Sequence, residues 1–393
     1  MVEWKKLGDF GPYFGGLTGK TKEDFVEGNA KFITYMNVFS NPSLDISSTG
    51  VVRINDDEKQ NKIQRGDILF TGSSETPDEA GMSCVVTEEL NEDYYMNSFC
   101  FGIRLENPDQ YSLGYLKHIL RSSDIRKAIS KSASGVTRFN ISKARFGKIL
   151  IPIPSLSEQQ RIVGILDTFT SAIDNLKEQI AQRRKQYEYY RDQLLDLEGK
   201  PGVEMKTLGD VCIKTSNIRW KNTSDNEAFK YIDLSSVNRD THTIDNVLEI
   251  NKDNAPSRAQ QIVYKGDVVL GTTRPTLRRY CQIPQQYDNQ ICSTGFCIYR
   301  ANKDVVLNRW LFHNIGNRNF WDYCELKQQG AGYPCLSNSD AFAYIIPVPS
   351  LQEQERIVSF LDTFEASIQN LEAQLSQREK QYEYYRNKLL TFE

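Results

Sequence analysis

The sequence predicts an α+β protein in which two mixed α/β heads are separated by a two-helix antiparallel coiled coil, arranged as a pseudo-twofold tandem repeat. Three observations predict this fold. Residues 151–195 recur without gaps at 346–390, and 29 of the 45 positions are identical. Both copies carry an apolar heptad pattern, which is typical of coiled-coil helices. The segments before each copy alternate short β-type runs with turn signals, which is typical of globular α/β domains.

The repeat divides the 393 residues into four parts. We expect a first head, a first long helix, a second head and a second long helix, over residues 1–150, 151–200, 201–345 and 346–393. Both heads open with similar octapeptides, Val2–Asp9 and Val203–Asp210, and both contain a Gly-Asp pair. Residues 10–60 and 210–260, in contrast, share almost nothing. The two heads are therefore expected to contact different partners, and the two repeated segments to contact the same kind of partner.

Each head, at about 150 residues, is a comfortable size for one domain. The β-type runs are at residues 31–35, 67–70, 99–103, 267–270 and 296–299. Helices are expected at residues 112–130 and 308–326. The order of the strands does not follow from the sequence.

The repeated segments are expected to form long paired helices. Ser155 with Glu158, and Ser350 with Glu353, have the spacing of a capping box at a helix start. Apolar residues then follow in steps of four and three, broken in both copies by an arginine, Arg183 and Arg378, that we interpret as fixing the register. Each helix of about 40 residues should be about 60 Å long, and the connectivity makes the pair antiparallel. The seam residues are Ile162, Leu166, Phe169, Ile173, Leu176, Ile180, Tyr187, Tyr190, Ile357, Leu361, Phe364, Ile368, Leu371, Leu375, Tyr382 and Tyr385.

Some residues outside the seam are also shared between the two copies. Restraint on a coiled-coil seam alone does not explain this, so we interpret part of the set as docking sites for a partner that binds both segments. These residues are Lys185, Tyr189, Arg191, Lys380, Tyr384 and Arg386.

The net charge of −3 argues against a protein that binds nucleic acid over its whole surface. Basic residues are concentrated locally, however, with eight against one acid in residues 121–148: Arg121, Arg126, Lys127, Lys131, Arg138, Lys143, Arg145 and Lys148. No stretch is long and apolar enough for a membrane span, and the N-terminus does not resemble a secretory signal. We therefore expect a cytoplasmic protein with no membrane partner.

Three loops in each head are candidates for contact with DNA. Arginine and lysine can bond bidentately to guanine and asparagine to adenine, while other basic residues bind phosphates. For any single residue, a solvated surface position remains an equally good interpretation. In head 1 the candidates are Lys20, Thr21, Lys22, Ser73, Ser74, Thr76, Arg138, Asn140, Lys143 and Arg145. In head 2 they are Arg219, Lys221, Arg274, Thr276, Arg278, Arg279, Tyr280, Tyr333 and Asn338.

The sequence shows no catalytic or metal-binding constellation. It lacks a phosphate-binding loop and the Asn/Asp-Pro-Pro-aromatic motif of amino-methyltransferases. The three histidines, His118, His242 and His313, have no acidic or nucleophilic neighbour evident in the sequence, so core or surface positions are expected. The eight cysteines are scattered, and Cys292 and Cys297 are interpreted as buried strand thiols.

Taken together, these motifs resemble the specificity subunit of a type I restriction-modification enzyme over the full chain. The resemblance rests on the Gly-Asp-Ile/Val motif of both heads and on Ile-Pro-Ile/Val-Pro-x-Leu-x-Glu-Gln, which leads into a Tyr-rich helix in both copies. It implies a non-catalytic subunit whose heads are target-recognition domains, each reading half of a bipartite asymmetric site on double-stranded DNA. It also implies that the helices set the spacer between the half-sites.

The same resemblance implies partners and cofactors. Two modification subunits, which carry S-adenosylmethionine and methylate adenine, would dock on this chain, and restriction subunits using ATP and Mg²⁺ would then join. No cofactor is expected in the chain itself. The acidic net charge suggests that the isolated chain binds DNA weakly. The alternatives are a coiled-coil adaptor with two ligand-binding heads that does not bind DNA, or a self-sufficient nuclease or methyltransferase.

Overall fold

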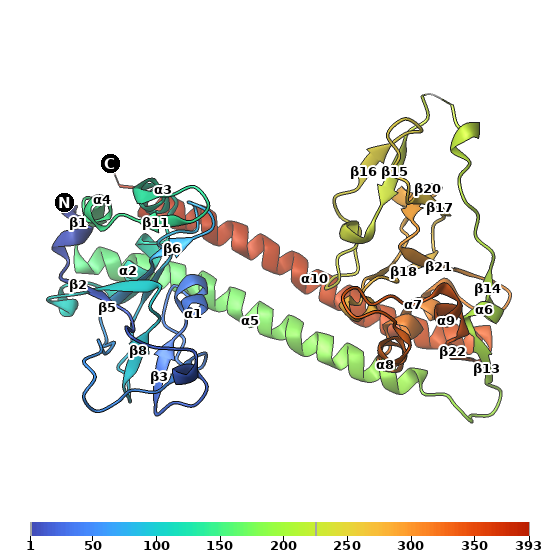
Figure 1. The fold of residues 1–393 in the computed structure, drawn as a ribbon, viewed down its shortest axis with the longest axis horizontal. Helices are drawn as coiled ribbons and strands as arrows, with labels where there is room; N and C mark the ends of the chain where they lie inside the picture. Colours follow the sequence, from blue (N-terminus) through green and yellow to red (C-terminus); the bar gives the residue numbers. More distant parts are fainter. Residues whose placement is uncertain (1, 225, 393) are drawn as a thin grey trace. The chain divides into compact units, whose positions relative to one another are not determined.

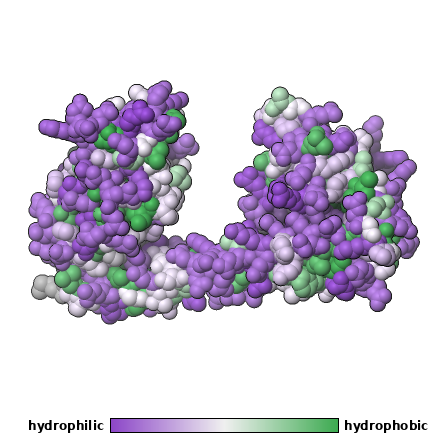
Figure 2. Space-filling model, turned by 90° about the horizontal axis from the view of Figure 1, so that it is seen from below, coloured by the Kyte–Doolittle hydropathy of each residue, from purple (hydrophilic) through white to green (hydrophobic). Residues whose placement is uncertain are grey.

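The computed structural model describes residues 2–224 and 226–392. The contacts divide the chain into two compact units. Unit 1 contains residues 1–177 and 373–393, and unit 2 contains residues 178–372. Each unit therefore combines one mixed α/β head with parts of both long helices (Figure 1). Hydrophilic residues cover most of the face of each unit seen in Figure 2, and the hydrophobic patches between them are small.

The head of unit 1 contains a four-stranded sheet in the order β2-β9-β5-β7 and a three-stranded sheet in the order β4-β3-β8. Smaller sheets pair β1 with β12 and join β10, β11 and β6. The strands are β1 (Glu3–Lys6), β2 (Tyr13–Gly15), β3 (Ala30–Ile33), β4 (Gly50–Val52), β5 (Asp67–Thr71), β6 (Ser73–Ser74), β7 (Ser83–Val85), β8 (Tyr94–Met96), β9 (Cys100–Arg104), β10 (Ala133–Ser134), β11 (Phe139–Ile141) and β12 (Leu150–Ile153). The helices of this head are α1 (Tyr35–Ser40), α2 (Leu113–Ile119), α3 (Ser123–Ser132) and α4 (Lys143–Phe146).

The head of unit 2 contains two four-stranded sheets, β14-β21-β18-β19 and β16-β15-β20-β17, and the pair β13-β22. The strands are β13 (Glu204–Thr207), β14 (Cys212–Ile213), β15 (Phe229–Ile232), β16 (Leu248–Ile250), β17 (Ala259–Val263), β18 (Val268–Gly271), β19 (Tyr280–Gln282), β20 (Gln290–Ser293), β21 (Phe296–Ala301) and β22 (Ile345–Val348). The helices are α6 (Leu208–Val211), α7 (Asn308–Gly316), α8 (Arg318–Lys327) and α9 (Asn338–Ala343). Cys292 and Cys297 lie buried on β20 and β21, as predicted.

The Gly-Asp pair precedes or begins the central strand of each main sheet. Gly66 and Gly266 have φ angles of 90° and 91°, which favour glycine because it lacks a Cβ atom. Asp67 then forms two hydrogen bonds with the guanidinium of Arg104 on the neighbouring strand, at 2.9 and 2.8 Å. The second head repeats this arrangement with Asp267 as the acceptor. The motif therefore holds a turn and locks two strands together.

The two long helices, α5 (Leu156–Leu195) and α10 (Leu351–Leu390), have 40 residues each, as predicted. Ser155 caps the first helix by accepting a hydrogen bond from the backbone N–H of Glu158 at 3.4 Å. The reciprocal half of the predicted capping box is not formed, because the Glu158 carboxylate pairs with Arg161 at 2.7 Å instead. The second helix repeats both features.

In unit 1 the start of α5 packs against the end of α10. The rings of Phe169 and Tyr385 stack at 5.2 Å, and Lys177 lies 3.9 Å from Glu379. The guanidinium of Arg378 lies 5.8 Å from the Phe169 ring. As the residue numbers increase along α5, the numbers of the residues they contact on α10 decrease. The predicted antiparallel pairing is therefore confirmed within this unit.

Unit 2 repeats the pairing with the roles of the two helices exchanged. Tyr190 lies 5.5 Å from Phe364, and Arg184 pairs with Glu372 at 2.6 Å. The seam arginine Arg183 lies over the Phe364 ring at 5.7 Å. Each seam arginine therefore contacts an aromatic ring of the opposite helix, which gives the predicted break in the seam a specific packing partner.

Two expected helices are each divided in the structure. Residues 112–130 form α2 and α3, and residues 308–326 form α7 and α8. At the second break, the Asn317 side chain accepts a hydrogen bond from the backbone of Asn319 and so starts a new helix. Within the described ranges, no helix has the length and apolar character needed to cross a membrane.

Candidate nucleic-acid interface

In head 2, two of the three predicted loops form one surface. The loop after β18 meets the loop before α9 through a β-bridge between Thr273 and Cys335. The backbone N–H of Arg274 donates to Pro334 O at 2.6 Å, and Leu336 donates to Thr272 O at 2.9 Å. The candidates of these two loops are therefore neighbours in space, although about 60 residues separate them in the sequence.

This surface presents two arginines on an unusual backbone. Arg274 and Arg278 flank a short 3-10 turn at Pro275–Leu277, and both adopt a left-handed conformation, with φ angles of 51° and 52°. The left-handed conformation costs a non-glycine residue conformational free energy, and residues strained in this way are concentrated at functional sites. The Arg274 guanidinium lies 4.3 Å from the ring of Tyr333, which is 72% exposed. Both arginines are exposed, so they can reach a ligand outside the head.

The neighbouring candidates are less accessible. Tyr280 was predicted as a DNA contact, but it is only 3% exposed and packs against Phe312, at 5.1 Å, and Trp321. It lies on β19, and the alternation of the strand turns its side chain into the core. Arg279 is half-buried, and its Nε has no hydrogen-bond partner among the described residues.

Head 1 also brings its second and third loops together. Strand β11 pairs with β6, which places Asn140 opposite Ser73. Arg138, Asn140, Lys143 and Arg145 are exposed on this side of the head. The Arg138 guanidinium lies 5.4 Å from the Phe99 ring, and the Lys143 ammonium lies 5.4 Å from the Phe101 ring. Basic groups on aromatic faces thus occur at the candidate surface of both heads.

Three candidates of head 1 are wrong as surface contacts. Ser73 and Ser74 are 6% and 8% exposed, because their strand is covered, and the Ser74 hydroxyl donates to Glu79 at 3.2 Å. The Lys20 side chain is 5% exposed and pairs with Glu58. Sequence reasoning missed this pair because 38 residues separate its members.

The remaining candidates are exposed but not all clustered. Thr76 bonds to Glu79 at 2.9 Å, and Thr21 bonds to Asp24 at 3.1 Å. The first loop of head 2 lies beside β17, where Ile218 donates to Gln260 O. The exposed candidates in the first loops, in the loop after β18 and at the start of α9 are Lys22, Arg219, Lys221, Thr276 and Asn338.

The basic stretch 121–148 is only partly a surface feature. Arg121 donates to the carbonyls of Ser83, Val38, Phe39 and Asn41, and Arg126 donates to carbonyls of residues 78–81. Burial lowers the pKa of both guanidinium groups to about 10. These two arginines hold loops of head 1 in place and do not contribute to an exposed basic surface.

Some of the proposed docking residues are exposed, and others are buried or half-buried. Tyr189 and Tyr384 are 60% and 59% exposed, and Lys185 and Lys380 are exposed beside them. Arg191 is only 7% exposed, because its guanidinium packs over Tyr187 at 5.4 Å and bonds to Asp192. Arg191 is therefore not exposed on the helix surface as the docking prediction required. Arg386 is half-buried and lies over Tyr382 at 5.4 Å.

Two histidines have acidic neighbours that were not evident in the sequence. His118 Nε2 lies 2.8 Å from Asp167 Oδ1, and His313 Nε2 lies 2.9 Å from Asp362 Oδ1. Both histidines are buried, as expected for core positions. The separation of 49 residues concealed these contacts, but the conservation of both residues at the repeat offset of 195 was a usable signal. Among the described residues, no group of three or more His, Cys, Asp and Glu side chains could hold a metal ion.

Comparison with known proteins identifies matching families and folds. A sequence model described as "Type I restriction modification DNA specificity domain" matches residues 1–183 and 201–379. The EcoR124I/EcoR124II specificity subunit of Escherichia coli is 31% identical over 270 residues, which cover 62% of this chain and 63% of that subunit. The chain thus matches less than two thirds of the length of this relative.

Solved structures share the fold over nearly the whole chain. The S subunit of a type I restriction-modification system from M. genitalium has a TM-score of 0.56 at 16% identity, covering 100% of this chain and 97% of that one. A structure describing complex assembly and conformational transition of the type I system has a TM-score of 0.58 at 17% identity, covering 99% of this chain and 97% of the other. At these identities the likeness establishes the fold alone.

Proposed function

Because the chain belongs to the type I restriction-modification DNA specificity family, we propose that it is the non-catalytic, DNA-reading subunit of such a system. Each head reads one half of a bipartite, asymmetric site on double-stranded DNA. The observation that carries this proposal is the contrast between unlike exposed loops on the two heads and the similar helices that follow them, which belong to segments with 29 of 45 positions identical. Unlike loops read unlike half-sites, whereas a palindromic site would need like heads.

In head 2, Arg274 and Arg278 are the residues best placed for base recognition. A guanidinium that lies against an aromatic ring keeps its N–H groups free along its edge, and this edge matches the O6 and N7 acceptors of guanine in the major groove. The strained backbone and the β-bridge to the neighbouring loop fix the Cα positions from which these two side chains extend. In head 1, Arg138 and Asn140 have the corresponding role, and Lys143 and Arg145 contact phosphates.

The two long helices set the spacer between the half-sites. Each helix is continuous for 40 residues, and α5 ends shortly before the first strand of the second head. Removal of one heptad from each helix shortens it by about 10 Å. This deletion should change the preferred spacer by a few base pairs and leave both half-sites unaltered.

Two modification subunits dock at equivalent positions of the repeat. Lys185 and Tyr189 on α5 recur as Lys380 and Tyr384 on α10, and all four are exposed. The modification subunits supply S-adenosylmethionine and methylate adenine, while restriction subunits use ATP and Mg²⁺ in the cytoplasm. The modification subunits also complete the positive surface around the DNA, because this chain has a net charge of −3. The isolated chain should therefore bind DNA weakly, and tight site-specific binding would contradict this part of the proposal.

The test is to sequence methylated adenines in cells that express the chain with its modification subunit. The wild type should give one asymmetric bipartite motif. Arg274→Ala with Arg278→Ala should relax one half-site, because a bidentate base contact discriminates by about 1–3 kcal/mol, and should leave the other half-site unchanged. Lys265→Ala, which removes an exposed basic side chain at the opposite end of β18, is the control. A motif that is unchanged by the double substitution contradicts the assignment of these two residues.

Absence of any methylation motif that depends on the chain would instead favour an adaptor that does not bind DNA. Methyl transfer or cleavage by the purified chain alone would contradict its non-catalytic role.

A further inference from the structure

A chain of three side chains, centred on a buried histidine, links the head of unit 1 to both long helices. His118 lies on α2 and is 1% exposed. Its Nε2 is 2.8 Å from Asp167 Oδ1 on α5, and its Nδ1 is 3.1 Å from the Tyr382 hydroxyl on α10. A neutral imidazole with its proton on Nε2 satisfies both contacts, since it donates to the carboxylate and accepts from the tyrosine. One residue of the head thus contacts two helices, through residues that are more than 200 positions apart in the sequence.

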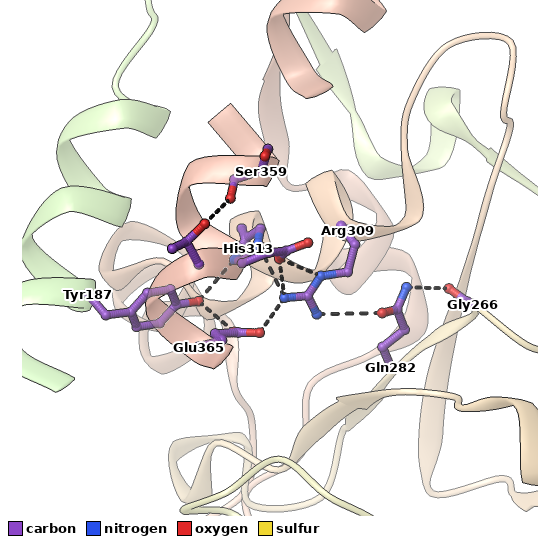
Figure 3. A network of polar contacts seen from close by, with 9 residues as sticks. Tyr187, Gly266, Gln282, Arg309, His313, Ser359 and Glu365 are labelled. Carbon is purple, nitrogen blue, oxygen red and sulfur yellow. Dashed lines mark hydrogen bonds and ion pairs between the residues drawn. The ribbon is translucent and has the colours of Figure 1, made fainter. Parts of the chain in front are cut away.

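Unit 2 contains the same triad at the repeat offset. His313 on α7 lies 2.9 Å from Asp362 on α10 and 2.9 Å from the Tyr187 hydroxyl on α5. Figure 3 shows Tyr187, His313, Arg309 and Glu365 pointing toward one another in this cluster. The two long helices have exchanged roles, because the aspartate now comes from α10 and the tyrosine from α5.

Among the described residues, the other polar contacts that recur in both units join each head to the helix that follows it in the chain or to the strand that leads into that helix. Gln159 accepts from the backbone N–H of Ser112, and Gln354 likewise accepts from Leu307. Tyr115 and Trp310 donate to carbonyls of the prolines that precede the two helices, at 2.7 and 2.9 Å. Among these recurring polar contacts, the histidine is therefore the one that also engages the second helix.

The triads persist although the heads have diverged. The chain has three histidines, and two of them occupy this equivalent position. The aspartate and the tyrosine also recur at the offset of 195, while large parts of the heads share almost nothing. A general need for a buried side chain does not explain this pattern, because an apolar residue fills such a position without needing two polar partners.

We propose that the residues of the two triads are positioning residues. They couple the orientation of each head on the long helices to the pairing of those helices. Apolar contacts tolerate small rotations, whereas hydrogen bonds to both nitrogens of a buried imidazole are directional and select one arrangement. A triad forms completely only when α5 and α10 are in the correct register with each other, and only then does the head have a single fixed orientation on the helices. This inference rests on the proposed function for its consequence, which is that the triads restrict the DNA spacer.

The two triads differ in how strongly they are supported. In unit 2, Arg309 bonds to Asp362 at 2.6 Å and also pairs with Glu365. The Tyr187 hydroxyl lies 3.0 Å from Glu365 Oε1 and 2.9 Å from His313 Nδ1, and its single proton can be donated to only one of these acceptors. The positions equivalent to Arg309 and Glu365 are Gly114 and Thr170 in unit 1, where Lys117 pairs with Asp167 at 2.8 Å. Loss of the tyrosine hydroxyl should therefore loosen head 1 more than head 2.

The first experiment needs no DNA. Hydrogen exchange of the α2 amides is measured in the full chain carrying Tyr382→Phe, Asp167→Asn or both substitutions. Because contacting residues in one network are coupled, the double variant should deviate by about fivefold or more from the product of the single effects. Tyr384→Phe removes a hydroxyl from an exposed ring on the same helix and should leave the exchange unchanged. Multiplicative effects of the two substitutions would overturn the inference.

The second experiment measures methylation by the complex on DNA sites whose spacers differ by one base pair in either direction. Tyr382→Phe should reduce the preference for the wild-type spacer about fivefold without changing either half-site, and Tyr187→Phe should reduce it less. A spacer preference within twofold of the wild type in both variants would overturn the inference. The proposed function fails separately, if the wild-type complex shows no spacer-dependent bipartite site.

Discussion

The aspartate of the Gly-Asp motif forms an ion pair with an arginine of the neighbouring strand. Breaking this ion pair tests how much it contributes to the stability of each head. In head 2, Asp267 is 3% exposed and accepts two hydrogen bonds from Arg300, at 2.9 and 2.7 Å. It also accepts a bond from the Tyr264 backbone at 2.9 Å. Asp267→Asn keeps the shape but places an amide N–H₂ or a neutral oxygen against the guanidinium of Arg300, whose side chain is only 15% exposed. Breaking a buried pair from one side costs about 3–5 kcal/mol.

The assay is urea unfolding of the purified chain followed by tryptophan fluorescence. Trp220, Trp310 and Trp321 lie in unit 2, whereas unit 1 contains Trp4, so the signal reports mainly on unit 2. With an m-value of about 2 kcal/mol per M, the midpoint should fall by about 1.5–2.5 M.

The matched control is Asp67→Asn, which breaks the equivalent pair in head 1. It should shift the urea midpoint measured by tryptophan fluorescence by less than about 0.5 M. It should instead lower the urea midpoint of an unfolding transition that is measured by circular dichroism. The reasoning is refuted if Asp267→Asn moves the midpoint by less than about 0.5 M with an unchanged slope, because the pair would then contribute little to the stability of the head.

Three further predictions concern the seam, the turn and pH. Leu361 is fully buried, so Leu361→Ala should cost about 2–5 kcal/mol in urea unfolding, whereas the exposed Tyr189→Ala should change the midpoint little. Gly266→Ala should destabilise head 2 by about 1–3 kcal/mol, because φ is 91° and the added Cβ would lie 2.1 Å from Asn308 Nδ2; a neutral effect would show that the turn relaxes freely. Burial lowers the pKa of His118, and Lys117 and Arg386 oppose its protonation, although Asp167 favours it. The unfolded state therefore takes up this proton first, so stability should fall as the pH drops below about 6.5. His118→Gln should weaken that dependence without abolishing it, because burial also lowers the pKa of His313 and His242.

The long helices could be predicted from the sequence because their signal is periodic and occurs twice. The heptad steps fixed the seam, and the connectivity required an antiparallel pair. The stacking of Arg183 on Phe364 could not be predicted, since a heptad pattern identifies which face packs and does not identify the partner of a polar residue on that face. The division of the expected helices in the heads was missed for a similar reason, because Asn317 is a weak break signal until its side chain is seen to cap the next helix.

The candidate DNA contacts could be located as loops but less well as single residues. The sequence placed Arg274, Arg278 and Arg138 on the surface, where the structure finds them. It could not show that Lys20 is covered or that Tyr280 faces the core, because both depend on contacts between segments far apart in the chain. The triads were missed for the same reason, although the repeat offset already aligned all of their members.

The most direct measurement of the central claim is the methylated-adenine motif of a chain in which residues 10–145 are replaced by the corresponding head of a relative that has a different site. Unlike heads on like helices should give a motif in which one half-site changes, while the other half-site and the spacer stay as in the wild type. A motif in which both half-sites change, or in which only the spacer changes, would contradict the assignment of one half-site to each head.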